Sequence, residues 1–200
     1  MRAEKTNTEL RKEQIAQAAL DIIGGEGVHA LSVAGIAERV GIVPSAVYRH
    51  YSGKDEIIEA VIDLLDKRLT GNVAAARREA SDALDQLKTM LMRHVDMLKA
   101  HSIIPHVVFS DGIYTGHPER RERVGRLMSG YIDSIKNIIR EGQKRGEVRD
   151  DVDAASAALS FMGIIMPAAV LWDISGRRFD VKNHAKKAWE LFERGFSARS

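Results

Sequence analysis

Residues 32–54 read SVAGIAERVGIVPSAVYRHYSGK, and this stretch decides the fold of the N-terminal part of the chain. It has the pattern of two short helices joined by a glycine turn. Ser32 stands where a serine caps a helix, Gly41 where a glycine ends one, and Pro44 in the first turn of the next. The second helix carries aromatic and basic residues. This pattern predicts a helix-turn-helix unit of the kind that binds DNA.

The second of these helices divides into an inner and an outer side. Val47 and Tyr51 are four residues apart, so we expect both to pack inward. The side chains left on the outer arc are Ser45, Ala46, Tyr48, Arg49 and His50. Ser45, Ala46 and Arg49 share one face by helical spacing, which suits a helix lying in the major groove.

Four further groups favour phosphate contacts around this helix. Tyr48 and His50 flank the base-facing side, where a hydroxyl and an imidazole N–H can reach the DNA backbone. Ser32 and Lys54 stand at predicted helix N-termini, whose backbone amides attract anions. From Arg39 to Lys54 there are three basic residues and no acidic one, although the net charge of the whole chain is only +2. The prediction therefore depends on local charge, because the overall charge alone does not indicate a nucleic-acid partner.

The pattern Ser-Val-x-x-Ile-Ala-x-x-Val-Gly-x-x-Pro-Ser-Ala-x-Tyr-x-His-Tyr-x-x-Lys resembles the DNA-binding signature of the TetR family of bacterial transcriptional regulators. The resemblance covers about residues 10–60. It implies about nine helices, a homodimer on a palindromic double-stranded operator, and a ligand pocket in the C-terminal domain. It also implies a ligand-responsive regulator, most often a repressor, that leaves DNA when a small apolar molecule binds. Carried over by position, the residues facing base edges are Pro44, Ser45 and Ala46, and those holding phosphates are Ser32, Tyr48, His50 and Lys54.

Three features depart from that signature or limit what it specifies. Val43 precedes Pro44 where the family often has a capping serine or threonine. Ala34 and Gly35 are too short to reach bases from the first helix of the motif. Because the other base-facing residues are small, Arg49 is the one side chain there that can bind guanine through two hydrogen bonds.

The rest of the chain shows helical periodicity almost throughout, which predicts an all-α protein. We expect a DNA-binding domain over residues 1–54 and a helical ligand-binding and dimerisation domain over residues 55–200. The first helix is expected to begin at Thr6 and to stop at the glycines from Gly24 onward. A fourth helix should begin with a Ser52–Asp55 cap and end near Leu69. The caps predicted for the last two helices are Asp153 and Asp180.

Methionines and aromatic residues are numerous in the C-terminal part, and most of them could simply be core. Methionine also suits adaptable apolar pockets. The candidates for a ligand pocket are Met90, His94, Met97, Phe109, Tyr114, Met128, Tyr131, Met162 and Met166. Such a pocket would suit hydrophobic drugs, fatty-acyl compounds or aromatic molecules about equally.

Residues 157–172 form the longest apolar stretch, shorter than the roughly 20 residues needed to span a membrane. With the last helix, this segment is a candidate for a four-helix dimer seam, as the family resemblance implies. The predicted interface residues are Leu159, Gly163, Trp189 and Phe192. The alternative is that this helix is only the central core of the monomer.

Several other functions receive no support from the sequence. The chain has no cysteine, which excludes disulfides and favours a cytoplasmic location, and we expect no signal peptide and no membrane partner. The Glu26-x-x-His29 pattern occurs once, whereas a di-iron bundle needs two copies, so no metal or other cofactor is expected. No enzyme motif is present. The main alternative to a regulator is a helical ligand-sensing module that no longer binds DNA, and activation remains an alternative to repression.

Overall fold

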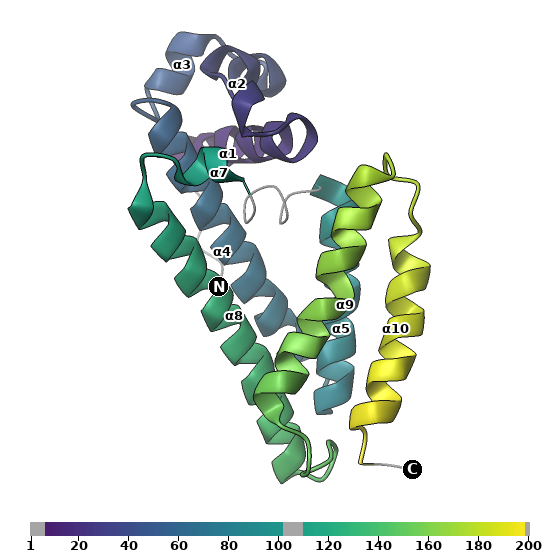
Figure 1. The fold of residues 1–200 in the computed structure, drawn as a ribbon. Helices are drawn as coiled ribbons and strands as arrows, with labels where there is room; N and C mark the ends of the chain where they lie inside the picture. The colour runs from purple at the N-terminus through teal and green to yellow at the C-terminus, as the bar shows by residue number, and fades with distance from the viewer. Residues whose placement is uncertain (1–6, 102–109, 199–200) are drawn as a thin grey trace. The chain divides into compact units, whose positions relative to one another are not determined.

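The structure, a computed structural model, describes residues 7–101 and 110–198. Within these ranges the chain forms nine α-helices and one short 3-10 helix (Figure 1). The same ranges contain one isolated β-bridge, between Val148 and Ser197, and no strand. The predicted all-α fold is confirmed.

The residues group into two compact units. The first comprises residues 1–67 and 101–124, and the second comprises residues 68–100 and 125–200. Helices α4 (Lys54–Glu79) and α8 (Pro118–Lys144) each contribute residues to both units. The division by contacts therefore does not follow a single cut in the sequence, and the domain boundary at residue 54 stays a prediction.

The first unit contains the helix-turn-helix pair. Its complete helices are α1 (Asn7–Glu26), η1 (Val28–Ala30), α2 (Val33–Val40), α3 (Pro44–Tyr48) and α7 (Asp111–Tyr114). The Ser32 Oγ accepts a hydrogen bond of 3.1 Å from the Gly35 N–H and caps α2. Gly41 ends α2 with a φ of 73°, a left-handed conformation that favours glycine. These two predictions from the sequence are confirmed.

Tyr51 fixes the end of the motif against α1. Its hydroxyl donates a hydrogen bond of 3.0 Å to the Lys12 carbonyl, and the Lys12 Nζ lies 5.5 Å from the centre of its ring. Burial raises the pKa of Tyr51 to about 12, so the hydroxyl stays protonated and able to donate. Val47 is fully buried beside it. The expectation that Val47 and Tyr51 pack inward is confirmed.

Two helix ends differ from expectation. Helix α1 continues through Gly24 and ends at Glu26, followed by Gly27 with a φ of 83°. Packing overrides the weak helix propensity of glycine here, because Gly24 itself is buried. Helix α4 ends at Glu79 rather than near Leu69. The predicted Thr6 start lies outside the described residues.

The start of α4 is also capped differently from the prediction. The Glu56 carboxylate accepts a hydrogen bond of 2.6 Å from the Ser52 N–H. This bond holds the pKa of Glu56 below its ordinary value. The Asp55 carboxylate instead faces α8, as described below. The predicted Ser52–Asp55 cap is therefore wrong, because Glu56 rather than Asp55 accepts from Ser52. Helix α4 does begin at the expected place.

Val43 precedes α3 with extended backbone angles and provides no capping hydrogen bond. Its side chain is 62% exposed, so a serine there would replace no buried contact. We expect Val43→Ser to raise the free energy of unfolding by about 0.5–2 kcal/mol, because a serine Oγ can accept from an unpaired N–H of the first turn. Thermal unfolding of the wild type, Val43→Ser and Val43→Ala measures this. Equal stability of the serine and alanine variants would contradict the prediction.

The second unit is built from the later parts of α4 and α8 together with α5 (Ala83–His101), α9 (Ala154–Ile174) and α10 (Val181–Phe196). Asp153 caps α9 by accepting from the Ser156 N–H at 2.7 Å, and Asp180 caps α10 by accepting from the Asn183 N–H at 3.1 Å. Both predicted caps are confirmed.

Helix α9 is longer than its apolar stretch suggested. At 21 residues the whole helix is long and apolar enough to cross a membrane by length and composition, although residues 157–172 alone are not. Half of its most apolar window is nevertheless buried inside the chain. A helix buried by its neighbours in this way is a core helix of the second unit.

Helices α9 and α10 lie side by side (Figure 1) and pack through aromatic side chains. The ring of Phe192 lies 6.0 Å from that of Phe161 and 5.5 Å from that of Trp189. Trp189 and Phe192 are only 2% and 6% exposed, so the chain itself covers them. Their prediction as interface residues is wrong, because α10 uses its aromatic side to cover α9.

Candidate nucleic-acid interface and ligand site

Helix α3, the second helix of the helix-turn-helix motif and here called the recognition helix, presents a small exposed surface. Pro44, Ser45 and Arg49 are exposed, and Tyr48 is 57% exposed. Ala46 is only 6% exposed, so its predicted place on the outer arc is wrong. Its methyl group is small enough to pack between α3 and the rest of the unit. The base-facing candidates that remain accessible are Pro44, Ser45 and Arg49.

The predicted phosphate-binding groups around α3 differ in exposure and in their hydrogen bonds. The Ser32 hydroxyl is exposed and uses its oxygen as a cap, so its hydrogen remains available to donate. The Lys54 ammonium donates a hydrogen bond of 3.2 Å to the Val28 carbonyl while its side chain stays exposed. His50 is half-buried, and its Nδ1 is buried without a partner. Tyr48, like Ser32 and Lys54, is exposed, so His50 is the least accessible of the four.

The two arginines of the motif differ in how they are held. Arg39 is paired with Glu26 at 3.0 Å. The Arg49 side chain has no ion pair or hydrogen bond among residues 7–101 and 110–198, while its backbone N–H donates to the Val47 carbonyl at the C-terminal end of α3. Ala34 is exposed but short, as expected. Arg49 is therefore the unengaged cation beside the recognition helix.

The first turn of α4, directly after α3, is bound to the first turns of α8 within the first unit. Arg120 donates to the Glu59 Oε1 at 2.6 Å and to the Asp55 Oδ1 at 2.9 Å. Its guanidinium also reaches the backbone carbonyls of Ile113 at 3.4 Å and Asp55 at 3.3 Å. The Arg120 side chain is only 3% exposed. Hydrogen bonding by Arg120 holds the pKa of Asp55 below its ordinary value.

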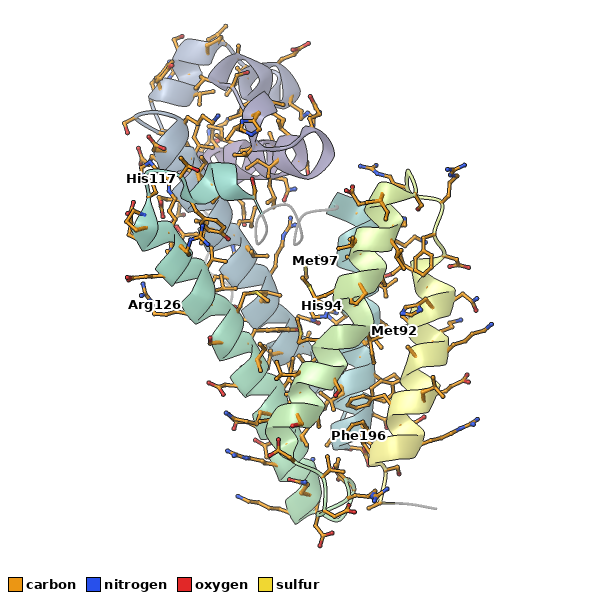
Figure 2. The ribbon with its side chains drawn as sticks, in the orientation of Figure 1. Met92, His94, Met97, His117, Arg126 and Phe196 are labelled. Atoms are coloured by element: carbon orange, nitrogen blue, oxygen red, sulfur yellow. The ribbon has the colours of Figure 1, made fainter. Side chains whose placement is uncertain are left out.

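Arg123 and His117 extend this cluster, and Figure 2 shows His117 at the N-terminal end of α8. Arg123 donates to the Glu59 Oε2 at 2.6 Å and pairs with Asp63. The His117 Nε2 lies 3.4 Å from the Asp55 Oδ1. Sequence reasoning missed these contacts, because RRER at the start of a helix has the pattern of a solvated surface. We call Asp55, Glu59, Asp63, Arg120 and Arg123 the α4–α8 ion cluster.

The interior of the second unit contains a polar cluster formed by Asn72, His94 and Tyr131. The Asn72 Nδ2 donates to the Met90 carbonyl at 3.1 Å and to the Tyr131 hydroxyl at 3.0 Å. The ring of His94 lies 5.3 Å from that of Tyr131 at an interplanar angle of 65°. Figure 2 shows His94 and Met97 on the side of α5 where α8 lies. All three cluster side chains are buried.

The other pocket candidates divide between the units. Met97, Met128 and Met166 are half-buried and Met162 is buried, all in the second unit with Met90, His94 and Tyr131. Tyr114 belongs to the first unit, where the Arg121 guanidinium lies 4.9 Å from the centre of its ring. Phe109 lies outside the described residues. Asn72 was missed by the sequence analysis, since a single asparagine in a long helix gives no distinguishing signal.

Burial lowers the pKa of His94 from its ordinary 6.5 to about 4. As the pH falls from about 6.5 to about 4, His94 becomes protonated in the unfolded chain but stays neutral in the folded chain. The free energy of unfolding is therefore highest above pH 6.5 and decreases as the pH falls through this range. Between pH 7 and 4.5 we expect the wild type to lose about 2 kcal/mol more unfolding free energy than His94→Leu. Urea unfolding at both pH values measures this. Equal losses in the two proteins would contradict it.

The described residues contain no group of three or more histidine, cysteine, aspartate or glutamate side chains that could hold a metal ion. The arrangement that the structure offers is instead an exposed recognition helix in one unit and a buried polar cluster among apolar side chains in the other.

Comparison with known proteins agrees with this arrangement. Residues 15–61 match the family model described as bacterial regulatory proteins, tetR family, and residues 65–195 match the one described as YsiA-like protein, C-terminal region. The fatty acid metabolism regulator protein of Bacillus subtilis is 21% identical over 183 residues, which cover 91% of this chain and 93% of that protein. The nucleoid occlusion factor SlmA of Vibrio cholerae is 22% identical over 154 residues, covering 76% and 79% respectively.

A solved structure shares the fold at low sequence identity. The crystal structure of the transcriptional regulator FadR from Bacillus subtilis in complex with stearoyl-CoA aligns with a TM-score of 0.72 and 21% identity. The alignment covers 91% of this chain and 97% of that one. At this identity the likeness establishes the fold alone.

A helix-turn-helix unit joined to a helical ligand-binding domain defines the class of ligand-responsive, DNA-binding transcriptional regulators. The matched models cover most of the chain, and the chain belongs to the TetR family of bacterial regulatory proteins. The family predicted from residues 32–54 is confirmed.

Proposed function

We propose that this chain is a cytoplasmic repressor that binds a palindromic operator as a homodimer and is released by a long-chain acyl-CoA. The observation that carries the DNA-binding part is the exposed recognition helix with the unengaged Arg49 at its end. The effector class is suggested by the Bacillus subtilis relative, whose structure was solved with stearoyl-CoA. It also agrees with the apolar character expected of the effector.

In the proposed operator complex, Arg49 contacts a guanine edge while Pro44 and Ser45 lie close to the bases. Tyr48 and Ser32 contact the phosphates of the DNA backbone, because Tyr48 presents an exposed hydroxyl on α3 and Ser32 presents one at the N-terminus of α2. Lys54 needs to exchange its bond with the Val28 carbonyl for a phosphate, or to donate to both, since an ammonium has three donors.

Arg49→Ala is expected to weaken operator binding by about 1–3 kcal/mol and to relax the preference at one base pair per half-site. Arg49→Lys is the matched control, because it keeps the charge but loses the planar fork. Fluorescence anisotropy on operator variants, at several salt concentrations, separates the two roles. A uniform loss across all variants, with rescue by lysine, would make Arg49 a phosphate contact instead.

The proposed dimer uses the outer faces of α9 and α10. Leu159 and Ile174 on α9 are 59% and 73% exposed, and Leu191 on α10 is 72% exposed. Gly163 and Gly195 are exposed on the same faces, and a Cβ added to either would meet nothing within 4 Å of the chain. Glycine inside an exposed helix costs about 1 kcal/mol relative to alanine, which a close approach by a second helix would explain. Such an apolar, small-residue strip fits a two-fold seam with another copy.

The effector is proposed to act on DNA binding through α4. Residues 54–67 of this helix belong to the first unit and residues 68–79, including Asn72, belong to the second. A ligand that binds the second unit more tightly in the released state would shift α4 and change the separation of the two recognition helices. These helices have to stand about 34–36 Å apart, or a multiple of this, to enter successive major grooves.

The test begins with an operator selected from random DNA by the purified protein. We expect sequence-dependent binding that weakens with salt, and release of the operator by stearoyl-CoA but not by free coenzyme A. Binding without sequence preference at low salt would refute the regulator proposal and favour a ligand-sensing module. Release by neither compound would refute the effector class, and tighter DNA binding with stearoyl-CoA would indicate the opposite sign of control.

A further inference from the structure

The Asn72–His94–Tyr131 cluster has hydrogen-bonding capacity that the described residues leave unused. The Nδ1 and Nε2 of His94 and the Oδ1 of Asn72 are buried, and none has a hydrogen-bond partner there. The Tyr131 oxygen accepts from Asn72, so its own hydrogen can still be donated. His94 and Asn72 are 1% and 2% exposed, which places these groups out of reach of bulk water.

The chemistry of these unused groups is complementary to one oxygen atom. His94 is neutral near pH 7, because burial lowers its pKa to about 4, so one ring nitrogen donates and the other accepts. Asn72 adds an acceptor and Tyr131 adds a donor. A carbonyl oxygen can accept from His94 or Tyr131, and a hydroxyl can in addition donate to Asn72.

The three side chains come from three helices, Asn72 from α4, His94 from α5 and Tyr131 from α8, and they lie beside the same turn of α5. The Asn72 amide bonds the carbonyl of Met90, four residues before His94, and the His94 ring touches that of Tyr131 by its edge. The positions on α5 three or four residues from His94 are apolar, with Met90 buried and Met97 half-buried. Polar groups that stay unpaired inside an apolar interior destabilise a protein, which suggests that they are retained for a ligand.

We propose that Asn72, His94 and Tyr131 form a polar subsite that recognises one carbonyl or hydroxyl oxygen of the effector within an otherwise apolar ligand site. The effector is then more than a hydrocarbon chain, because its buried part carries an oxygen atom at a fixed distance along the ligand site. This inference rests on the proposed function, because it assigns the specificity of the same ligand site. In an acyl-CoA the oxygen can be that of the thioester or one carried by the chain.

Matched probes distinguish the two sources of the oxygen. Isothermal titration calorimetry of the full chain would use stearoyl-CoA, S-octadecyl-CoA, which lacks the carbonyl, and 12-hydroxystearoyl-CoA, which adds a hydroxyl. If the thioester is recognised, stearoyl-CoA binds about 10-fold more tightly than S-octadecyl-CoA. If a chain oxygen is recognised, the hydroxylated probe binds more tightly than stearoyl-CoA by a similar factor.

Two variants connect the preference to the cluster. His94→Leu and His94→Phe should bring the affinity ratios close to one, while Met92→Leu, a half-buried position on another face of α5, should leave them unchanged. Equal affinity of the wild type for all three probes overturns the proposal. So does a preference that survives in both His94 variants.

A measurement without effector keeps this proposal separate from the proposed function. If unpaired polar groups are held for a ligand, His94→Leu or His94→Phe should raise the Tm of the effector-free protein by roughly 2–6 °C. A lower Tm in both variants overturns the polar subsite, since His94 would then stabilise the free chain. If no CoA compound binds, the acyl-CoA proposal fails, and the Tm comparison decides the subsite by itself.

Discussion

Replacing Ile174 and Leu191 together by glutamate is expected to convert the proposed dimer into a monomer and to weaken operator binding by about 100-fold or more. These side chains are 73% and 72% exposed in the single chain, so their replacement removes no internal packing. In the proposed dimer they would lie in the seam, where four buried carboxylates could not all be paired. A monomer would have to bind each half-site independently and would lose the avidity of two linked recognition helices.

Sedimentation equilibrium gives the oligomeric state, and anisotropy on the selected operator gives the affinity. Leu10→Glu is the control, because Leu10 is 45% exposed on α1 and lies outside the α9–α10 strip. It should leave the mass of the assembly unchanged. A double variant that remains dimeric with an unchanged melting temperature would show that the strip is not the seam.

The part of the fold that sequence predicts best is the part fixed by local chemistry. The Ser32 cap and the Gly41 turn involve atoms at most a few residues apart, so a single stretch contains all the information. The same holds for the caps at Asp153 and Asp180. Tyr51 was placed inward by its spacing from Val47, although its hydrogen bond to Lys12 lies 39 residues away.

What sequence alone could not give depends on contacts between distant helices. Spacing placed Ala46 on the outer arc, but burial by neighbouring helices put it inside. Trp189 and Phe192 have the composition of an interface, and only the path of α10 along α9 shows that they are core. The Asn72–His94–Tyr131 cluster joins residues from three helices, and its hydrogen bond between Asn72 and Tyr131 spans 59 positions.

The α4–α8 ion cluster gives the second large expected effect. Arg120→Ala should lower the free energy of unfolding by about 2–4 kcal/mol, because it removes charge-assisted hydrogen bonds and a buried side chain at once. The partner carboxylates of Asp55 and Glu59 remain partly exposed, at 70% and 36%, and can be hydrated. The loss should therefore fall below that of a fully buried ion pair.

Arg123→Ala and Arg120→Lys are the matched comparisons for this prediction. Arg123 shares Glu59 but is 34% exposed against 3% for Arg120, so its removal should cost well under half as much. Lysine at position 120 keeps the charge but cannot reach Glu59, Asp55 and the Ile113 carbonyl together, so it should recover only part of the loss.

The same variant tests whether the ion cluster holds the recognition helix in place. Asp55 and Glu59 lie in the first turns of α4, which follows α3 after five residues, and Arg120 joins these turns to α8 within the first unit. Losing that connection should lower operator affinity under conditions where the chain is still folded, since the position of α3 becomes less restricted. Urea unfolding and operator anisotropy on Arg120→Ala measure both effects. If Arg120→Ala costs no more stability than Arg123→Ala, the buried guanidinium is not what fixes α4 against α8.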